Sequence, residues 1–344
     1  MQELNIIQYK KPFYPARRFL KAHLVRYSRW ANLPVSYEDL LRYRDLMPVK
    51  DKDGNETLWY SVLYDHGEMD YLQDSLRSVY ELLKGSGVSV SYLKIASIEF
   101  CSFGNSKPFR IKVVNEINDN HDYYYVKRAD ASRIYGLELE EIFSPDKVSF
   151  LVGGTTLIEE HIVGIPCDEF ILKNIEVKIE NRTRFAKEFV KFNERCFTRL
   201  LGDMRAYNFV VEIIQDFDNV QYRLRAIDFD QQSFEGRKSI YLPQYYKDNI
   251  ALVKLATELL SAQVADQYRR EELEGMKKRL GANKTRAKSL INSMRKDRIS
   301  TPEHIQTLRA DLAHHHKDES FLALTTMGGI LAKHLEQQLN VQLF

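Results

Sequence analysis

The chain has 344 residues, of which 44% are hydrophobic and 28% are charged, as in an ordinary globular protein. Its 12% of aromatic residues is more than a disordered chain contains. Fifty lysine and arginine residues against 48 acidic ones leave a net charge of only +2, which argues against a dedicated nucleic-acid-binding protein. The sequence has no signal-peptide pattern and no apolar run long enough for a bilayer, so we expect a cytoplasmic protein without a membrane partner.

Residues 1–90 are predicted to form a separate mixed α/β appendage. A turn at 53–55 precedes a strand-like run at 57–64. Apolar side chains then recur every three or four positions from Met69 to Leu83, which predicts an amphipathic helix that ends at Gly85.

Residues 91–165 are predicted to form a small lobe built on an antiparallel sheet, because short strand-like runs alternate there with turns. The expected strands are 92–100, 109–114, 123–126, 148–152 and 155–163, with one helix at 129–143. Residues 166–344 are predicted to be a mostly helical lobe with a hairpin at 209–227 and a C-terminal helical extension, in which Thr301 caps a helix that begins at Pro302. The predicted fold class is therefore α+β with two lobes.

Two further patterns lie in the helical half. Residues 269–298 hold eleven basic and four acidic side chains, a local charge of +7. We interpret this stretch as a solvated helix face, with nucleic acid, a phosphorylated peptide or an acidic partner as alternatives. The run His314-His315-His316 is also interpreted as a solvated face, because neighbouring helical positions point about 100° apart and cannot converge on one metal.

The clearest chemical signal lies at residues 201–211. Asp203 precedes Asn208 by five residues, Arg205 lies between them, and an apolar strand begins directly afterwards. Asp228 ends a second apolar strand, and the predicted hairpin can return it to the same place. Phosphoryl transfer from a nucleotide uses such a set: one carboxylate for the acceptor hydroxyl, an amide oxygen and a second carboxylate for magnesium, and a cation for the phosphoryl charge.

With these motifs the chain resembles the protein-kinase-like superfamily, and most closely its atypical bacterial members, the HipA-like kinases and the aminoglycoside or choline phosphotransferases. Asp203 and Asn208 have the spacing of the catalytic loop His-Arg-Asp-x-x-x-x-Asn. Asp228 matches the metal-binding Asp that follows that loop, and Lys127 matches the strand lysine that holds the nucleotide phosphates. The resemblance covers about residues 92–260.

The resemblance implies ATP and Mg²⁺ as cofactors and a bilobed kinase-like fold. It implies that Asp203 is the base, Arg205 stabilises charge, and Asn208 and Asp228 bind Mg²⁺. A Glu of the helix after Lys127 should pair with this lysine; Glu138, Glu140 and Glu141 are candidates, and Glu138 is preferred because it lies beside an apolar stripe. The remaining nucleotide contacts would come from a phosphate-covering loop with Gly104, Asn105 and Ser106, and from a hinge with Glu159, Glu160 and His161.

The expected activity is phosphorylation of a Ser/Thr-type hydroxyl on a protein. A small-molecule kinase acting on a hydroxyl acceptor is the alternative within enzymes, because no acceptor pocket is recognisable. A pseudokinase that binds nucleotide as a regulatory module is the alternative outside enzymes. The presence of Lys127, Asp203, Asn208 and Asp228 together argues against this last possibility. Leu201, which replaces the histidine of the catalytic loop, and the single glycine of the phosphate loop favour it. Asp230 is either a third metal ligand or the cap of the following loop.

Overall fold

The computed structural model describes residues 11–85, 92–103, 105–174, 181–216 and 219–342. The chain folds into two compact units of mixed α and β structure, which confirms the α+β class. Unit 1 contains Leu24–Ala131, Ser149–His161 and the N-terminal segment up to Ala16. Unit 2 contains Arg17–His23, Ser132–Val148 and the chain from Ile162 onward.

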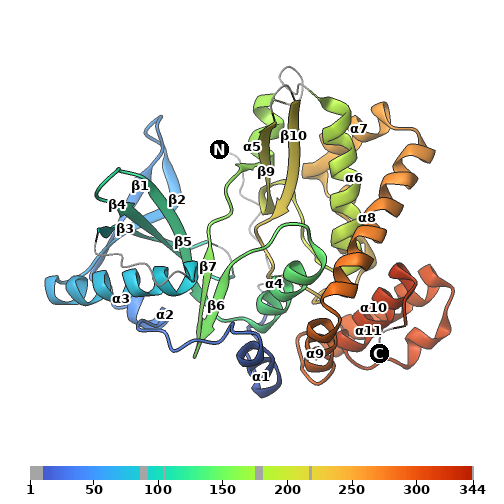
Figure 1. Ribbon diagram of the computed structural model, residues 1–344, viewed down its shortest axis with the longest axis horizontal. Helices are drawn as coiled ribbons and strands as arrows, with labels where there is room; N and C mark the ends of the chain where they lie inside the picture. Colours follow the sequence, from blue (N-terminus) through green and yellow to red (C-terminus); the bar gives the residue numbers. More distant parts are fainter. Residues whose placement is uncertain (1–10, 86–91, 104, 175–180, 217–218, 343–344) are drawn as a thin grey trace. The chain divides into compact units, whose positions relative to one another are not determined.

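Unit 1 is built on a seven-stranded antiparallel sheet with the strand order β1-β2-β3-β4-β5-β7-β6 (Figure 1). Its strands are β1 (Asp45–Lys50), β2 (Glu56–Leu63), β3 (Leu93–Cys101), β4 (Phe109–Asn115), β5 (His121–Arg128), β6 (Phe150–Gly153) and β7 (Thr156–Glu160). Its helices are α2 (Tyr37–Leu40), α3 (His66–Lys84) and the end of α1 (Arg18–Arg26), which begins in unit 2.

The first 90 residues are not the separate appendage that the sequence predicted. Strand β2 pairs with β3, with Trp59 opposite Cys101, so one sheet runs through both predicted parts. Helix α3 lies along one face of this sheet and buries most of the predicted apolar stripe, including Leu72 and Leu76, in a common core, whereas Leu82 is 46% exposed (Figure 1). It ends at Gly85, as expected, in a left-handed cap with φ 66° that glycine adopts without strain.

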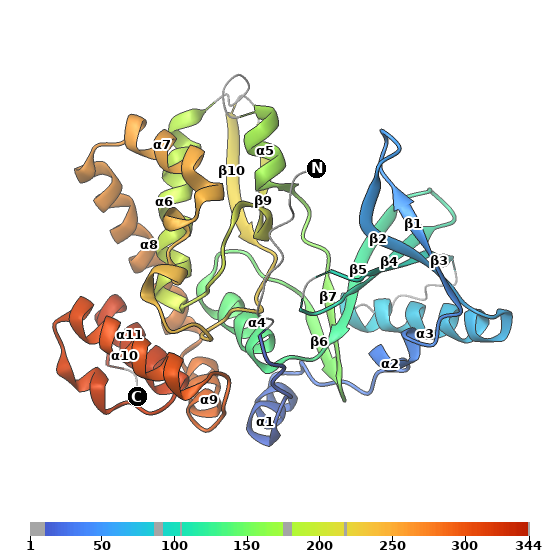
Figure 2. The ribbon, with the colours of Figure 1, turned by 180° about the vertical axis from the view of Figure 1, so that it is seen from behind.

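Unit 2 is mostly helical and contains a three-stranded sheet of order β10-β9-β8. The strands are β8 (Ile165–Pro166), β9 (Phe209–Asp216) and β10 (Asn219–Ala226). The α-helices are α4 (Ala131–Phe143, all but its first residue), α5 (Cys167–Asn174), α6 (Arg182–Arg199), α7 (Ile250–Leu259), α8 (Ala262–Ala282), α9 (Lys284–Arg295), α10 (Pro302–His316) and α11 (Met327–Leu339). Single 3₁₀ turns occur at η1 (Ala206–Asn208), η2 (Lys238–Tyr241), η3 (Pro243–Tyr245), η4 (Lys247–Asn249) and η5 (Glu319–Ala323). Helix α6 packs between β10 and α8 (Figure 2).

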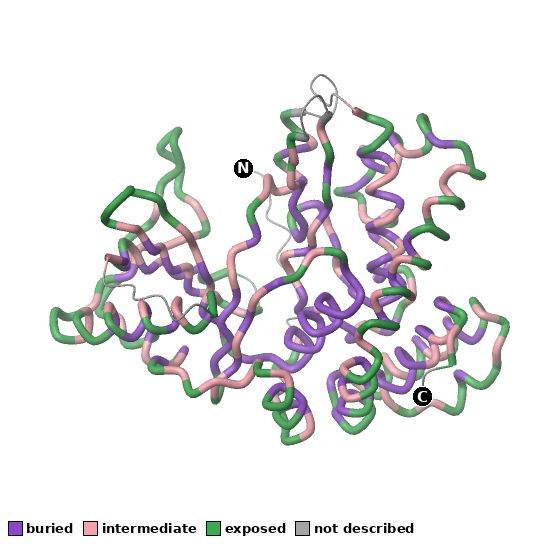
Figure 3. The backbone as a smooth tube through the Cα atoms, viewed as in Figure 1, coloured by how far each residue is buried: buried purple, intermediate pink, exposed green. Residues whose placement is uncertain are grey.

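Helix α4 is buried along its whole length, although the sequence assigned it to the sheet lobe (Figure 3). Tyr135 donates a hydrogen bond to Asp297 at 3.1 Å. A side chain at Gly136 would bring its Cβ to 2.9 Å from the Cβ of Phe229, so only glycine permits this approach to the chain. These contacts place α4 in unit 2, directly against the segment that carries Asp228.

The predicted start of helix α10 is confirmed. Thr301 is the N-cap and accepts a hydrogen bond from the backbone N–H of His304, and Pro302 is the first helical residue. Among the described residues, no helix combines the length and the apolar composition needed to cross a membrane.

The basic stretch 269–298 is only partly the solvated face that we predicted. Arg279 donates to the carbonyl of Phe143 at 2.6 Å and to Glu272 at 2.8 Å. Arg286 donates two hydrogen bonds to Glu138, at 2.7 and 2.9 Å. These two arginines therefore hold α8 and α9 to other parts of unit 2 and are not available to a partner.

The prediction of a solvated face at residues 314–316 is wrong for His316. Its Nε2 lies 2.9 Å from Nδ1 of His334, a fully buried side chain of α11. The Nε2 of His334 lies 3.0 Å from the carbonyl oxygen of Phe197, which can only accept. His334 must therefore carry its proton on Nε2, and its Nδ1 accepts from His316. The chain of hydrogen bonds runs from α10 through α11 to α6.

Acid should destabilise unit 2 through these two histidines. Burial lowers the pKa of His316 to about 4 and that of His334 to about 3, against about 6.5 in an unfolded chain. The unfolded state therefore binds more protons below pH 6.5, so this stability is complete above pH 6.5 and is lost as the pH falls toward 4. We expect a loss of about 2 kcal/mol per histidine between pH 7 and pH 5, measured by urea unfolding.

His316→Gln should remove part of this pH dependence. The matched control is His66→Gln, because the His66 side chain is 96% exposed. If both variants changed the pH dependence of the free energy of unfolding between pH 5 and pH 7 equally, His316 would not be a source of the acid sensitivity.

Candidate active site

The loop between α6 and β9 holds Asp203 in an unusual backbone conformation. Its φ of 58° lies in the left-handed region, which residues other than glycine seldom adopt. The backbone N–H of Asp203 donates to the Tyr246 hydroxyl at 3.0 Å and to the carbonyl of Ile240 at 3.3 Å. The loop is thus held by the segment that follows the hairpin, and the Asp203 carboxylate has a defined position.

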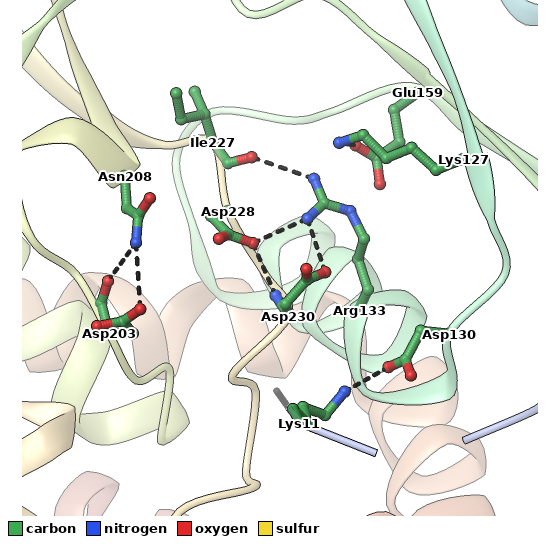
Figure 4. Close-up of polar contacts among 10 residues, drawn as sticks. All are labelled: Lys11, Lys127, Asp130, Arg133, Glu159, Asp203, Asn208, Ile227, Asp228 and Asp230. Atoms are coloured by element: carbon green, nitrogen blue, oxygen red, sulfur yellow. Dashed lines mark hydrogen bonds and ion pairs between the residues drawn. The ribbon is translucent and has the colours of Figure 1, made fainter. Parts of the chain in front are cut away.

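Asn208 supports the same loop from its other end. Its side-chain Nδ2 donates to the backbone carbonyl of Asp203 at 2.7 Å and lies 3.5 Å from a carboxylate oxygen of Asp203 (Figure 4). Because Nδ2 is engaged there, the amide oxygen of Asn208 points elsewhere, and it accepts no hydrogen bond within the described residues. The predicted convergence of Asp203 and Asn208 is therefore present.

The β9–β10 hairpin brings Asp228 to this loop, as the spacing suggested. Phe209 pairs with Ala226 at the end of the ladder, and the N–H of Ile227 donates to the carbonyl of Asn208 at 3.0 Å. Asp228 is the next residue along the chain. Two segments that are 20 residues apart in sequence thus meet at one end of a single hairpin.

Arg133 of α4 is the residue of this site that the sequence did not reveal. Its side chain is 2% exposed, and its Nη1 lies 2.9 Å from one oxygen each of Asp228 and Asp230 (Figure 4). Its Nη2 donates to the carbonyl of Ile227 at 3.1 Å. Asp230 is therefore an ion-pair partner of Arg133 in this structure, and its roles as a metal ligand or as a loop cap remain predictions. No motif signals Arg133, since it lies 95 positions from Asp228.

The oxygen donors of this site are of the kind that Mg²⁺ prefers. Asn208 supplies an amide oxygen and Asp228 a carboxylate, which with phosphate oxygens and water make a suitable ligand set. Within the described residues, no three His, Cys, Asp or Glu side chains group closely enough to hold a metal by themselves. A bound Mg²⁺ would have to share Asp228 with Arg133 or displace it.

Arg205 is tied to acids on both sides. Its Nε donates to Asp203 at 3.0 Å, and its Nη1 lies 3.4 Å from Asp248. Burial raises the pKa of Asp203, and the neighbouring Arg205 opposes that shift. Asp203 therefore combines a raised pKa with a fixed position, which are the properties expected of a general base.

In unit 1 Lys127 is paired with Glu159 and not, as predicted, with Glu138. The Lys127 ammonium lies 2.6 Å from Glu159 on the neighbouring strand, and both side chains are buried. Glu138 is instead bonded to His23 at 2.9 Å and to Arg286. The prediction of Glu138 is wrong because a fully buried acid takes whichever cations the tertiary fold brings to it.

The other two candidates for pairing with Lys127 are also occupied. Glu140 forms a buried ion pair with Arg199, and Glu141 lies 2.9 Å from Lys147. The three acids of α4 thus pair with cations of unit 2. The ion-pair partner of Lys127 is Glu159 of β7, which the sequence analysis assigned to the hinge.

The other hinge residues lie at the point where the chain passes from unit 1 to unit 2, between His161 and Ile162. The Glu160 carboxylate accepts from the backbone N–H of Ser149 at 2.7 Å, so it closes the β6–β7 pair. His161 Nδ1 lies 3.0 Å from the Tyr125 hydroxyl, and burial lowers the pKa of His161. Both side chains are thus engaged inside unit 1.

The predicted phosphate-covering loop is the connection between β3 and β4. Asn105 is exposed and Ser106 is half-buried, so both are accessible to a ligand. Gly104 lies outside the described residues. The loop is closed at its base by the N–H of Cys101, which donates to the carbonyl of Pro108 at 3.0 Å.

The predicted residues thus fall into two groups, each held together within its own unit. Lys127, Glu159, His161, Asn105 and Ser106 belong to unit 1. Asp203, Arg205, Asn208 and Asp228 belong to unit 2, together with Arg133. No protein-family model matches the chain, and no curated protein matches it significantly.

Proposed function

We propose that the protein is an ATP- and Mg²⁺-dependent phosphotransferase of the bilobed protein-kinase-like type, acting on a Ser/Thr-type hydroxyl of a protein. The observation that supports this proposal best is the arrangement at the end of the β9–β10 hairpin. Asn208 bonds to Asp203 there, while its own carbonyl accepts from Ile227, next to Asp228. In-line phosphoryl transfer needs such a set of side chains: a carboxylate for the acceptor hydroxyl, and an amide oxygen and a second carboxylate for the metal.

The chemistry follows from the proposed roles. Asp203 would accept the proton of the acceptor hydroxyl while that oxygen forms its bond to the γ-phosphorus and the bond to ADP breaks. Asn208 and Asp228 would hold Mg²⁺, which offsets negative charge on the phosphates. Lys127 of unit 1, oriented by Glu159, would bind the phosphates. Arg205 would remain the cation that stabilises charge beside Asp203.

A nucleotide-binding pseudokinase is the second candidate, because of Arg133. Its guanidinium lies 2.9 Å from Asp228, the carboxylate that an active enzyme needs for its metal. If this ion pair persists with nucleotide bound, the protein would bind ATP without turning it over. Transfer of phosphate to a generic acceptor protein from radiolabelled ATP separates the two functions.

Asp228→Ala tests metal-dependent nucleotide binding. The wild type should be stabilised by roughly 2.7 kcal/mol at a hundredfold excess of ATP and Mg²⁺ over the dissociation constant, and this thermal shift should vanish in the variant. The fold should survive, because Arg133 keeps Asp230 and the carbonyl of Ile227 as partners. Asp248→Ala, an exposed acid beside Arg205, is the control that should retain the shift. An undiminished shift in Asp228→Ala would remove Asp228 from the site.

A further inference from the structure

A groove on the surface of unit 2 gathers positive charge away from the candidate active site. It has a volume of about 360 Å³ and lies between α6, β10 and α8, which pack side by side in both views (Figures 1 and 2). Its lining comprises Arg184, Lys187, Glu188, Lys191, Gln221, Tyr222 and Tyr268. Three of these side chains are cationic and one is acidic.

The three cations lie on one face of α6, because their spacing of three and four residues returns them to the same side of the helix. Tyr268 of α8 lies opposite, with the ammonium groups of Lys187 and Lys191 at 4.7 and 5.3 Å from its ring centroid. The negative face of the aromatic ring attracts both charges and holds them at the groove. The cations are thus partly ordered before any ligand binds.

The acids that the structure describes near the groove do not cancel this charge. Glu188 is bonded to Arg195 at 2.6 Å, so its charge is already compensated from inside the unit. Lys191 has an acidic neighbour, Glu271, at 3.3 Å. Among the described residues, Arg184 and Lys187 form no ion pair. Within the described part of the chain, two cations without an acidic partner and a third beside them therefore face the groove.

A second groove, on another side of α8, has no net positive charge. That groove is lined by Arg270, Lys278, Glu271 and Glu274 together with Gln267 and Gly275. Its two cations and two acids balance. The first groove thus has a net positive lining that its neighbour lacks.

We infer that the groove formed by Arg184, Lys187, Lys191 and Tyr268 binds an acidic segment of a protein. Carboxylates match the cations in charge, and the Tyr268 ring offers an apolar contact to a peptide chain. A nucleic-acid strand is a poorer match, because only the rings of Tyr222 and Tyr268 line the groove, and Tyr222 is buried.

The position on α6 suggests what the segment could do, and this part of the inference rests on the proposed function. From Lys187 to the helix end at Arg199, α6 rises about 18 Å at about 1.5 Å per residue. The Asp203 loop follows directly. An extended peptide needs at least about five or six residues for this distance, because α6 is buried from Arg195 to Arg199 and the peptide has to pass around it. An acceptor with acidic residues at that spacing from its phosphorylated hydroxyl would bind both places at once.

The test measures binding of a fluorescein-labelled oligoglutamate peptide to the full chain by fluorescence anisotropy at low salt. Arg184→Glu combined with Lys187→Glu should weaken binding by roughly tenfold or more. Both side chains lack an ion pair in the described structure, so the change should leave the fold intact, which circular dichroism checks. The matched control, Lys254→Glu with Lys288→Glu, changes the charge equally at exposed positions of α7 and α9 and should keep the affinity within about twofold.

Equal losses in the two double variants would mean unspecific attraction to net charge and would overturn the inference. It would also be overturned if single-stranded oligothymidylate or inorganic phosphate displaced the peptide more effectively than unlabelled oligoglutamate. Because the assay requires no phosphoryl transfer, its outcome is independent of the proposed function. The experiments therefore distinguish a kinase that does not bind an acidic peptide in the groove from a protein that binds the peptide but has no kinase activity.

Discussion

Asp203→Asn is expected to lower the rate of phosphoryl transfer by on the order of a hundredfold to ten-thousandfold while nucleotide affinity changes only a few-fold. Asparagine cannot accept the hydroxyl proton, whereas the loop should keep its geometry. The principal contact of Asn208 is with the backbone carbonyl of Asp203, at 2.7 Å, which the substitution leaves in place. Single-turnover assays with radiolabelled ATP measure the rate, and the thermal shift measures nucleotide binding.

Asp248→Asn is the matched control for this prediction. It removes a carboxylate that lies 3.4 Å from the same Arg205, but at an exposed position. Activity should remain within about twofold of the wild type, because rim charges contribute little. Burial raises the pKa of Asp203, so wild-type activity should fall with acid at a pH above that of an ordinary carboxyl group, as the base becomes protonated. Full activity in Asp203→Asn would remove Asp203 from catalysis.

Arg133→Met is expected to lower the free energy of unfolding of the protein by about 3–5 kcal/mol. The substitution keeps most of the side-chain volume but leaves Asp228 and Asp230 without their shared cation. The Asp230 side chain is only 10% exposed, so its charge would be buried without compensation. Urea unfolding followed by circular dichroism measures the loss.

The ion pair between Arg223 and Asp146 provides the comparison. It has a similar distance, 3.0 Å, but the Arg223 side chain is 47% exposed. Arg223→Met should therefore cost no more than about 1 kcal/mol. Asp230→Asn introduced together with Arg133→Met should restore part of the stability, because it removes the buried charge that Arg133→Met leaves without its cation. If Arg133→Met were as mild as Arg223→Met, Arg133 would not be the residue that holds this segment.

The sequence by itself determined most helices and strands of the fold and the convergence of the acidic and amide side chains of the candidate site. The stripe from Met69 to Leu83 became α3, and the alternating runs after residue 92 became β3 to β7. The spacing of Asp203, Asn208 and Asp228 also sufficed to predict their convergence in one unit. Helix and strand periodicity, caps and hairpins are local properties, and their residues are close in sequence. Such patterns can be recognised without the rest of the chain.

Only the tertiary structure decided which charges pair. Glu138 pairs with His23 and with Arg286, which lies 148 positions away, and Lys127 pairs with Glu159. Arg133 forms an ion pair with Asp228, although no sequence pattern links the two residues. A buried charge is stable only with a compensating partner, and the partner is whichever opposite charge the packing of distant helices and strands brings within reach. Pairing of this kind has no period and no motif, so it depends on the folded chain as a whole.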